Sequence, residues 1–410
     1  MARTNNLVRH AILALSPTYM LDYMALPEIE ERAKFHHGMA VELLTKELNN
    51  LEVYDPGSGR ETPIVAALIL LAHNQIVNWQ TWRGTQGASK WYLTATKAEY
   101  LLESSDPAYH YRDPNNVQFT KARFALGQLV CLDTVLSDPI FPLDITAGRC
   151  RVPWILHGTE HERLRIVGMN GLSPQLMHYF AKITFFAAMI FKETQSAANT
   201  FQGVSTFGPT NMGCVTVLME ILEKLKNLRQ WSTITIGLSS EEVLCSVHLT
   251  EDGKVQDPID VTQLIAASYV EAAQIYLQCR AISRPREHIE VQRSLLRLLK
   301  LIEWQPTSGK LFTAQTPLFA VFIAGIVSST QYQRAVVKKW FKATTEESRG
   351  NVMPVWMALQ ELWSLQDTTG NFNETVPFMD IEVNYPAGAH AWWEDMVKAV
   401  VDSHGRLNLA

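Results

Sequence analysis

Apolar residues recur three and four positions apart along most of the chain, which is the spacing of an α-helix that buries one face. In the first part of the chain this spacing predicts a series of helices that pack as antiparallel neighbours. The predicted helices cover Leu7–Leu15, Ala33–Leu51, Ile64–Trp82 and Tyr92–Leu102. Dense turn residues, such as those at 54–59 and 113–116, separate them.

The same periodicity returns in the second part of the chain. Ser173-Pro174 places a proline in the first turn of a helix, and the run Gln175–Glu193 is apolar on nearly every side. That run predicts a helix buried in the middle of the protein. Further helices are predicted at 213–231, 260–280, 288–304, 317–327, 331–345, 353–366 and 391–403.

Only two short segments, 232–237 and 243–255, alternate as strands do, so the pattern leaves room for one small β-hairpin near 232–255. The sequence therefore predicts an all-α fold, a large antiparallel stack of about 12 to 16 helices. We expect a single domain over 1–410. The turn-rich stretch 137–173 would divide it into an N-terminal helical half, 1–145, and a C-terminal helical half, 170–410.

Composition excludes several classes of protein. Hydrophobic residues make up 47% and charged residues 19%, which is a globular balance, and the net charge of −5 has the wrong sign for a phosphate-binding surface. The five cysteines are odd in number and far apart, so they predict neither disulfides nor a thiolate metal site. The longest apolar runs fall short of the roughly 20 residues of a membrane span. We expect a cytoplasmic or nuclear protein that does not enter a membrane.

Three motifs near the C-terminus carry a family resemblance. The segments 317–325 (PLFAVFIAG), 333–341 (QRAVVKKWF) and 358–363 (ALQELW) follow one another in an order that resembles the signature of the fungal-specific transcription factor domain. The resemblance extends over nearly the whole chain and is weakest at 103–170 and 230–260. It implies the helical regulatory domain of fungal zinc-cluster transcription factors.

The resemblance also implies a module that this sequence lacks. In the family, six cysteines bind two zinc ions ahead of the regulatory domain and place a helix in the major groove of DNA. Here Met1 stands five residues before the first predicted helix, with no cysteine cluster, basic linker or heptad run. We therefore expect no nucleic-acid binding by this chain alone.

Motifs for metal or cofactor chemistry are weak. His157-Gly-Thr-Glu160-His161 fits the H-x-x-E-H pattern of zinc peptidases, which needs a helix, but Pro153 and Gly158 predict a loop there. Ordinary surface histidines are the better interpretation. The sequence holds no aspartate-rich diphosphate site, glycine-rich phosphate loop or nucleophile elbow. We expect neither a metal nor a cofactor.

Polar side chains embedded in apolar helices are the remaining candidates for a site. Each alone is typical of a hydrogen-bonded core residue, but together they could direct a substrate inside an apolar pocket. The catalytic candidates are His73, His178 and Tyr179, and the substrate-binding candidates are Asn74, Trp79, Trp82, Tyr269 and Glu271.

Two functions follow from the sequence. The slightly favoured one is a cofactor-independent cyclase or isomerase of secondary metabolism, of the Diels–Alderase or a similar pericyclic type, acting on an apolar small molecule. The alternative is a regulatory domain of a fungal transcription factor that binds a ligand or a partner. A homodimer is left open. A closed pocket of roughly several hundred cubic ångströms would favour a small-molecule site, and a filled interior would favour a partner surface.

Overall fold

The computed structural model describes the chain except for residues 22–25, 51–60, 79–89, 105–120, 144–152, 157, 169, 201–208, 233–236, 252, 256, 313–316, 348–349 and 370–391. It divides into two compact units. Unit 1 consists of Met1–Leu136, Val152–Arg163 and Arg349–Asn351, and unit 2 of Ser137–Arg151, Leu164–Ser348 and Val352–Ala410. Three of the boundaries between the units lie within the turn-rich stretch 137–173 or next to it. The single domain over 1–410 stays a prediction.

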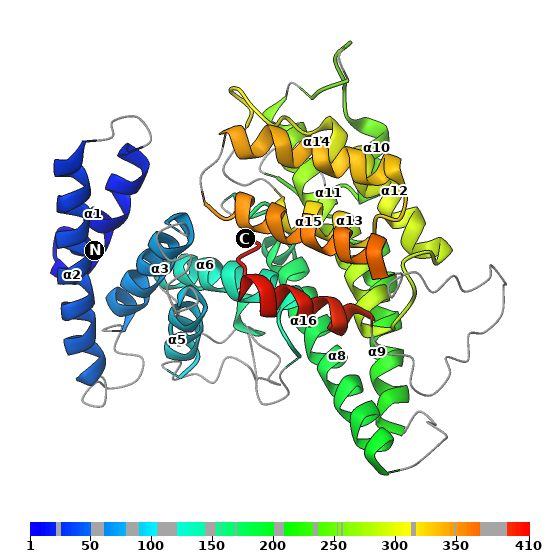
Figure 1. Cartoon of the computed structure of the whole chain (residues 1–410), viewed down its shortest axis with the longest axis horizontal. Coiled ribbons are helices and arrows are strands. Elements are labelled where there is room, and N and C mark those ends of the chain that lie inside the picture. Colours follow the sequence, from blue (N-terminus) through cyan, green and yellow to red (C-terminus); the bar gives the residue numbers. More distant parts are fainter. Residues whose placement is uncertain are drawn as a thin grey trace. The chain divides into compact units, whose positions relative to one another are not determined.

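Unit 1 is a group of antiparallel helices in which α1 packs against both α2 and α3, and α3 packs against α5 (Figure 1). Helix α1 begins after Asn5, whose side chain accepts a hydrogen bond from the Val8 amide at 3.0 Å. The elements of unit 1 are α1 (Asn6–Met20), α2 (Pro27–Asn49), α3 (Thr62–Val77), α5 (Trp91–Ser104), α6 (Lys121–Ser137), η4 (Pro153–Leu156) and α7 (Glu160–Arg163). The last residue of α6, Ser137, belongs to unit 2.

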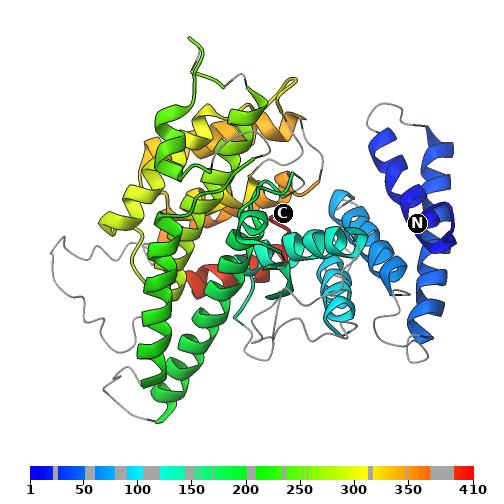
Figure 2. The same ribbon diagram turned by 180° about the vertical axis from the view of Figure 1, so that it is seen from behind.

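Unit 2 is a larger helical body in which α11 contacts α8, α9, α10, α12 and α13. Figure 2 shows α8 and α9 as long neighbouring helices. The elements of unit 2 are η3 (Asp138–Ile140), α8 (Pro174–Thr200), α9 (Pro209–Lys226), α10 (Ser240–Ser246), α11 (Pro258–Tyr276), η5 (Leu277–Ala281), α12 (Ile289–Trp304), α13 (Leu318–Val327), α14 (Gln331–Glu347), α15 (Val352–Thr369) and α16 (Trp392–His404).

Helix α13 lies within the core of unit 2. This position is possible because the sequence of α13 carries no charged residue. All ten of its residues are buried, between α11, α12, α14 and α15. Gly325 allows the close approach of α15, since a Cβ there would overlap the side chain of Leu359. Trp363 then donates a hydrogen bond from Nε1 to the Gly325 carbonyl at 3.0 Å. The segments 317–325 and 358–363 are therefore two sides of one helix contact.

The all-α prediction is confirmed: the structure is helical and, over the residues it describes, contains no strand or sheet. The prediction of a small β-hairpin near 232–255 was wrong for the described part of that segment. Residues 240–246 form α10, because Ser239 and Glu242 make a capping box that starts a helix. Two isolated bridges, Gln230 with Leu238 and Leu249 with Val255, flank it. Among the described helices, none combines the length and apolarity that crossing a lipid bilayer requires.

Candidate functional site

The predicted site residues are distributed over both units. His73 and Asn74 lie on α3 of unit 1, whereas His178 and Tyr179 lie on α8, and Tyr269 and Glu271 on α11, of unit 2. Trp79 and Trp82 lie outside the described residues. The contacts of each residue are therefore those within its own unit.

His73 and Asn74 are both engaged in unit 1. His73 Nε2 lies 3.1 Å from Oδ2 of Asp133, a side chain of α6 that is only 3% exposed. Burial alone would lower the pKa of His73, but the charge of Asp133 and this hydrogen bond together raise it above its usual value. Asn74 donates from Nδ2 to the Ala14 carbonyl of α1 at 3.1 Å. Both residues thus connect helices of the unit.

His178 is the predicted residue whose environment fits a purely structural role least well. It is buried on α8, and its Nδ1 has no hydrogen-bond partner among the residues that the structure describes. Burial, with the charge of Lys182 in second place, lowers its pKa to about 3, so its imidazole is neutral at physiological pH. The next residue, Tyr179, is half-buried and lies about 100° further around the helix.

Tyr269 and Glu271 do not converge on one point. They are two positions apart on α11, which turns their side chains about 200° from each other. The Tyr269 ring stacks on Phe319 with 6.0 Å between ring centroids. Glu271 is fully buried on the other side, where it accepts hydrogen bonds at Oε1 from Ser240 Oγ (2.6 Å) and Arg297 Nε (3.0 Å). Burial raises the pKa of Glu271, although these donors oppose the shift.

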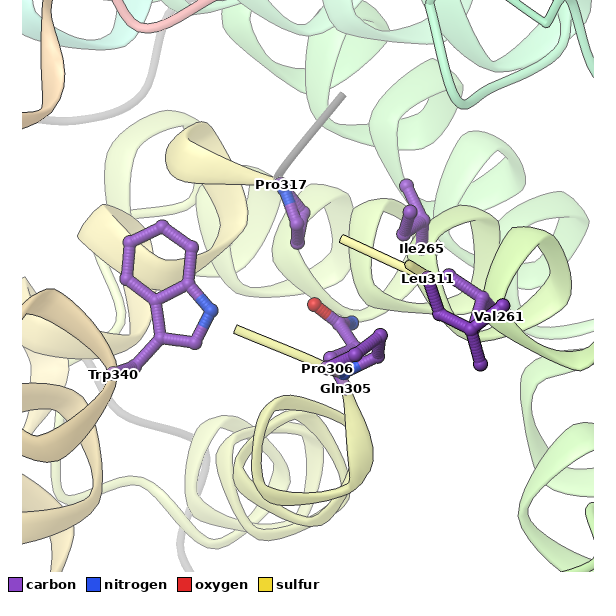
Figure 3. Close-up of a pocket in the computed structure, with 7 residues that line it drawn as sticks. All are labelled: Val261, Ile265, Gln305, Pro306, Leu311, Pro317 and Trp340. Carbon is purple, nitrogen blue, oxygen red and sulfur yellow. The ribbon is translucent and has the colours of Figure 1, made fainter. Parts of the chain in front are cut away.

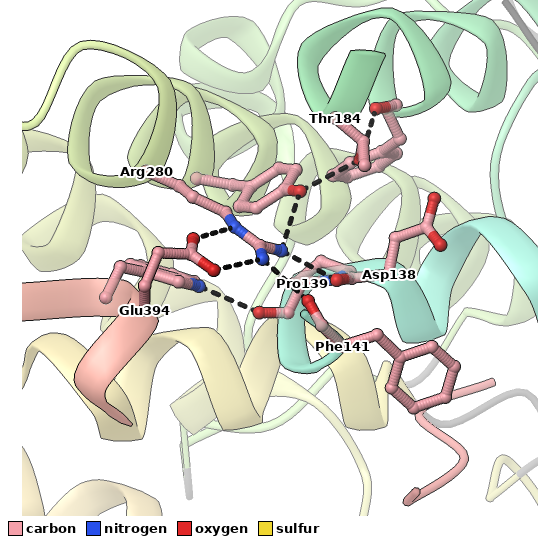
Figure 4. A network of polar contacts seen from close by, with 9 residues as sticks. Asp138, Pro139, Phe141, Thr184, Arg280 and Glu394 are labelled. Atoms are coloured by element: carbon pink, nitrogen blue, oxygen red, sulfur yellow. Dashed lines mark hydrogen bonds and ion pairs between the residues drawn. The ribbon is translucent and has the colours of Figure 1, made fainter. Parts of the chain in front are cut away.

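An extensive polar network in unit 2 is centred on Arg280 of the π-helix η5 (Figure 4). The Arg280 side chain is 0% exposed. Its Nε and Nη2 donate to the two carboxylate oxygens of Glu394 on α16, at 2.7 and 3.0 Å. Its Nη1 donates to the Asp138 carbonyl (2.6 Å) and Nη2 to the Phe141 carbonyl (2.7 Å). A guanidinium has five N–H donors, and the Tyr276 hydroxyl, 3.3 Å from Nη1, receives the remaining one.

Aromatic side chains extend this network. The Tyr276 hydroxyl also lies 2.9 Å from Thr184 Oγ1 of α8, and its ring lies 5.7 Å from that of Trp393. Trp393 donates from Nε1 to the Pro139 carbonyl at 2.8 Å. Every N–H group of Arg280 thus has a protein acceptor, so this network holds η3, α8, η5 and α16 together and leaves the guanidinium no free donor for a substrate.

Sequence reasoning missed this network. Glu394 is 114 residues from Arg280 along the chain, and two of the other acceptors are backbone carbonyls. The spacing of apolar residues along the chain does not reveal hydrogen bonds between residues that lie far apart in the sequence. The available signal was an arginine at the end of a mostly apolar helix, since a buried arginine needs a carboxylate partner.

One small pocket lies between α11, the segment after α12, and α14 (Figure 3). Its volume is about 10 Å³, room for roughly one water molecule. Its lining is mostly apolar, and Gln305, which contributes a polar group, donates to Ser268 Oγ at 2.8 Å. The residues that line it are Val261, Ile265, Gln305, Pro306, Leu311, Pro317 and Trp340. None of the predicted site residues that the structure describes is among them.

The zinc-peptidase motif is only partly described. His157 lies outside the described residues, and Glu160 and His161 are exposed in the single-turn helix α7. Among the residues that are described, no group of three or more His, Cys, Asp or Glu side chains is arranged to hold a metal ion.

The chain matches, over residues 1–405, the model of a family described as the fungal specific transcription factor domain. The chain belongs to this family. The fungal specific transcription factor domain thus accounts for nearly the entire sequence, and the Gly325–Trp363 contact is one packing role of its C-terminal motifs. No curated protein and no solved structure matches the chain.

Proposed function

We propose that the chain is a regulatory domain of fungal transcription that acts by binding another protein through its surface, in the nucleus. The observation that carries this proposal is the family match over residues 1–405. A domain that belongs to this family over nearly its whole length is expected to share the family's regulatory role, although a fold by itself does not fix a function.

The packing of unit 2 supports a surface role. In α11, every residue from Gln263 to Tyr276 is buried, as is all of α13, and large side chains such as Phe319 and Phe322 fill the space around them. Arg280 is buried and hydrogen-bonded to the protein itself. A closely packed interior makes a rigid platform, so recognition by this unit is best served by side chains on its outside.

A tethering experiment tests the proposal. The chain is fused to an unrelated DNA-binding module upstream of a reporter gene in a fungal cell. We expect reporter expression to change severalfold, up or down, relative to the module alone. Gly325→Ala should weaken the change because the new Cβ meets Leu359, whereas Gly38→Ala, with nothing within 4 Å of the added Cβ, should keep it. Reporter expression equal to that of the module alone, at equal nuclear abundance, would contradict the proposal.

The cyclase or isomerase interpretation stays a prediction of the sequence. It requires polar groups that converge on a pocket large enough for a substrate, on the order of several hundred cubic ångströms. Over the described residues, the pocket beside α11 has a volume of about 10 Å³, and His178 is not part of its lining.

A further inference from the structure

Two neighbouring helices of unit 2 expose large apolar side chains next to lysines. On α12, Ile289 is 50% and Leu296 is 51% exposed, and on α14, Tyr332 is 58% exposed. Single exposed apolar residues are common on protein surfaces, but a set on adjacent helices is typical of a binding surface. We call this surface the α12/α14 face. It comprises Ile289, Arg293, Leu296, Lys300, Tyr332, Ala335, Lys339 and Lys342.

Helical spacing places these residues in two stripes. On α12 the stripe is Ile289, Arg293, Leu296 and Lys300, and on α14 it is Tyr332, Ala335, Lys339 and Lys342; every member is exposed. The two helices are joined near their starts, where Gln333 Nε2 donates to Gln292 Oε1 at 2.7 Å. Gln292 stands between Ile289 and Leu296 on α12, and Gln333 follows Tyr332, so this bond brings the apolar parts of the two stripes together.

The other ends of the stripes are positively charged. Lys300, Lys339 and Lys342 are exposed and form no ion pair with any residue that the structure describes. Lys254 donates to the Glu303 and Gln305 carbonyls at the end of α12, at 2.7 and 3.2 Å. Burial lowers the pKa of Lys254, and repulsion from Lys339 lowers it further, while the charge of Glu303 opposes the shift without reversing it.

The acidic residues of the two helices form no ion pair with these lysines among the described residues. Glu290 pairs with Arg293 at 2.6 Å, and Glu303 and Glu346 lie at the same ends of the helices as Lys300 and Lys342 and offset only part of the charge. The whole chain carries a net charge of −5, so a face with a surplus of lysines is an exception to its average surface. Unneutralised lysines beside exposed apolar groups complement a surface that carries carboxylates and apolar side chains together.

We propose that the α12/α14 face binds an acidic amphipathic helix of a partner protein. Such a helix would lay its apolar side chains, three and four positions apart, against Leu296, Ile289 and Tyr332, and place its carboxylates over Lys339, Lys342 and Lys300. This inference rests on the proposed regulatory function and adds to it the chemistry of the partner.

Peptide binding to the purified full chain tests the inference. The probe is a fluorescein-labelled helical peptide of about 20 residues in which leucines recur three and four positions apart and glutamates occupy the other face. The control peptide replaces every glutamate by lysine. We expect fluorescence anisotropy to report saturable binding of the acidic peptide only, with an affinity that falls as salt is added.

Matched variants locate the binding. Ile289→Ala with Leu296→Ala should weaken binding about tenfold or more. The control, Met212→Ala with Met219→Ala, removes another exposed pair seven residues apart on α9 and should leave the affinity unchanged. Lys339→Glu with Lys342→Glu should weaken binding strongly at low salt and less at high salt, since screening removes the attraction that these lysines supply.

Several results would overturn the inference. They are equal binding of the two peptides, equal effects of the α12 and α9 pairs, displacement of the acidic peptide by a 20-base-pair DNA duplex, or a dimer of the chain that the α12 pair abolishes. The reporter assay separates failure of the surface from failure of the function. If the tethered chain still changes reporter expression while the peptide does not bind, only the assignment of the face is wrong.

Discussion

Replacing Arg280 by methionine should remove the central connection of unit 2. Methionine keeps an unbranched side chain of similar reach but has no N–H group. The change leaves the Glu394 carboxylate, which is 15% exposed, facing an apolar side chain, and it removes the hydrogen bonds from Arg280 to the Asp138 and Phe141 carbonyls.

The expected cost is large. Removing one partner of a buried ion pair typically costs about 3–5 kcal/mol, because the other charge stays buried without compensation. Since most domains are stable by only about 5–15 kcal/mol, this variant should lose a large fraction of its free energy of unfolding. Arg280→Lys should lie between the variant and the wild type, because an ammonium has three N–H groups in place of five.

Urea unfolding monitored by tryptophan fluorescence measures the effect, since Trp393 contacts the network directly. Arg293→Met is the matched control: Arg293 is 56% exposed, and its pair with Glu290 is expected to contribute no more than about 1 kcal/mol. If Arg280→Met and Arg293→Met shift the unfolding midpoint equally, the network does not hold unit 2 together and the reasoning is refuted.

Three further predictions follow from individual residues. Burial lowers the pKa of His178 from 6.5 to about 3, so the free energy of unfolding should decrease as the pH falls from 6.5 toward 3. His178→Gln should reduce this decrease by at most about 5 kcal/mol in acid unfolding curves. Asp133 raises the pKa of His73, so their ion pair stabilises the fold below pH 6.5 and this contribution is lost as the pH rises through the raised value. His73→Gln should therefore lower the free energy of unfolding more at pH 6 than at pH 9, and an equal decrease at both pH values would refute this. Gly325→Ala should lower the free energy of unfolding by about 1–3 kcal/mol, because Leu359 must move to make room for the new Cβ. An unchanged midpoint in urea unfolding would show that α15 shifts without a loss of stability.

Sequence periodicity predicted most of the long helices, because it reports which side of each helix is apolar, but it missed α6 at Lys121–Ser137. The run 317–327 was predicted as an apolar helix, and α13 is one, buried on all sides. Periodicity failed at 240–246, where local capping by Ser239 decides for a helix although the flanking residues alternate as strands do. A cap is a single contact between neighbouring residues, so a pattern averaged over a window does not detect it.

The candidate site was harder to predict, because polar residues within apolar helices arise for several reasons. Asn74 and Glu271 are such residues, and the structure pairs each with groups on other helices. Arg280, the centre of the network in Figure 4, was not selected, since its partners are distant in sequence. The sequence alone does not reveal whether a buried polar group already has a partner in its own chain, which is the property that separates a structural residue from a free one.

The most direct test of surface regulation is the reporter response of the tethered chain carrying alanines at Ile289 and Leu296, compared with the chain carrying alanines at Met212 and Met219. Circular dichroism first establishes that both variants are folded. The account predicts that the first pair abolishes the change in reporter expression and that the second preserves it. Full reporter activity in both variants would contradict it.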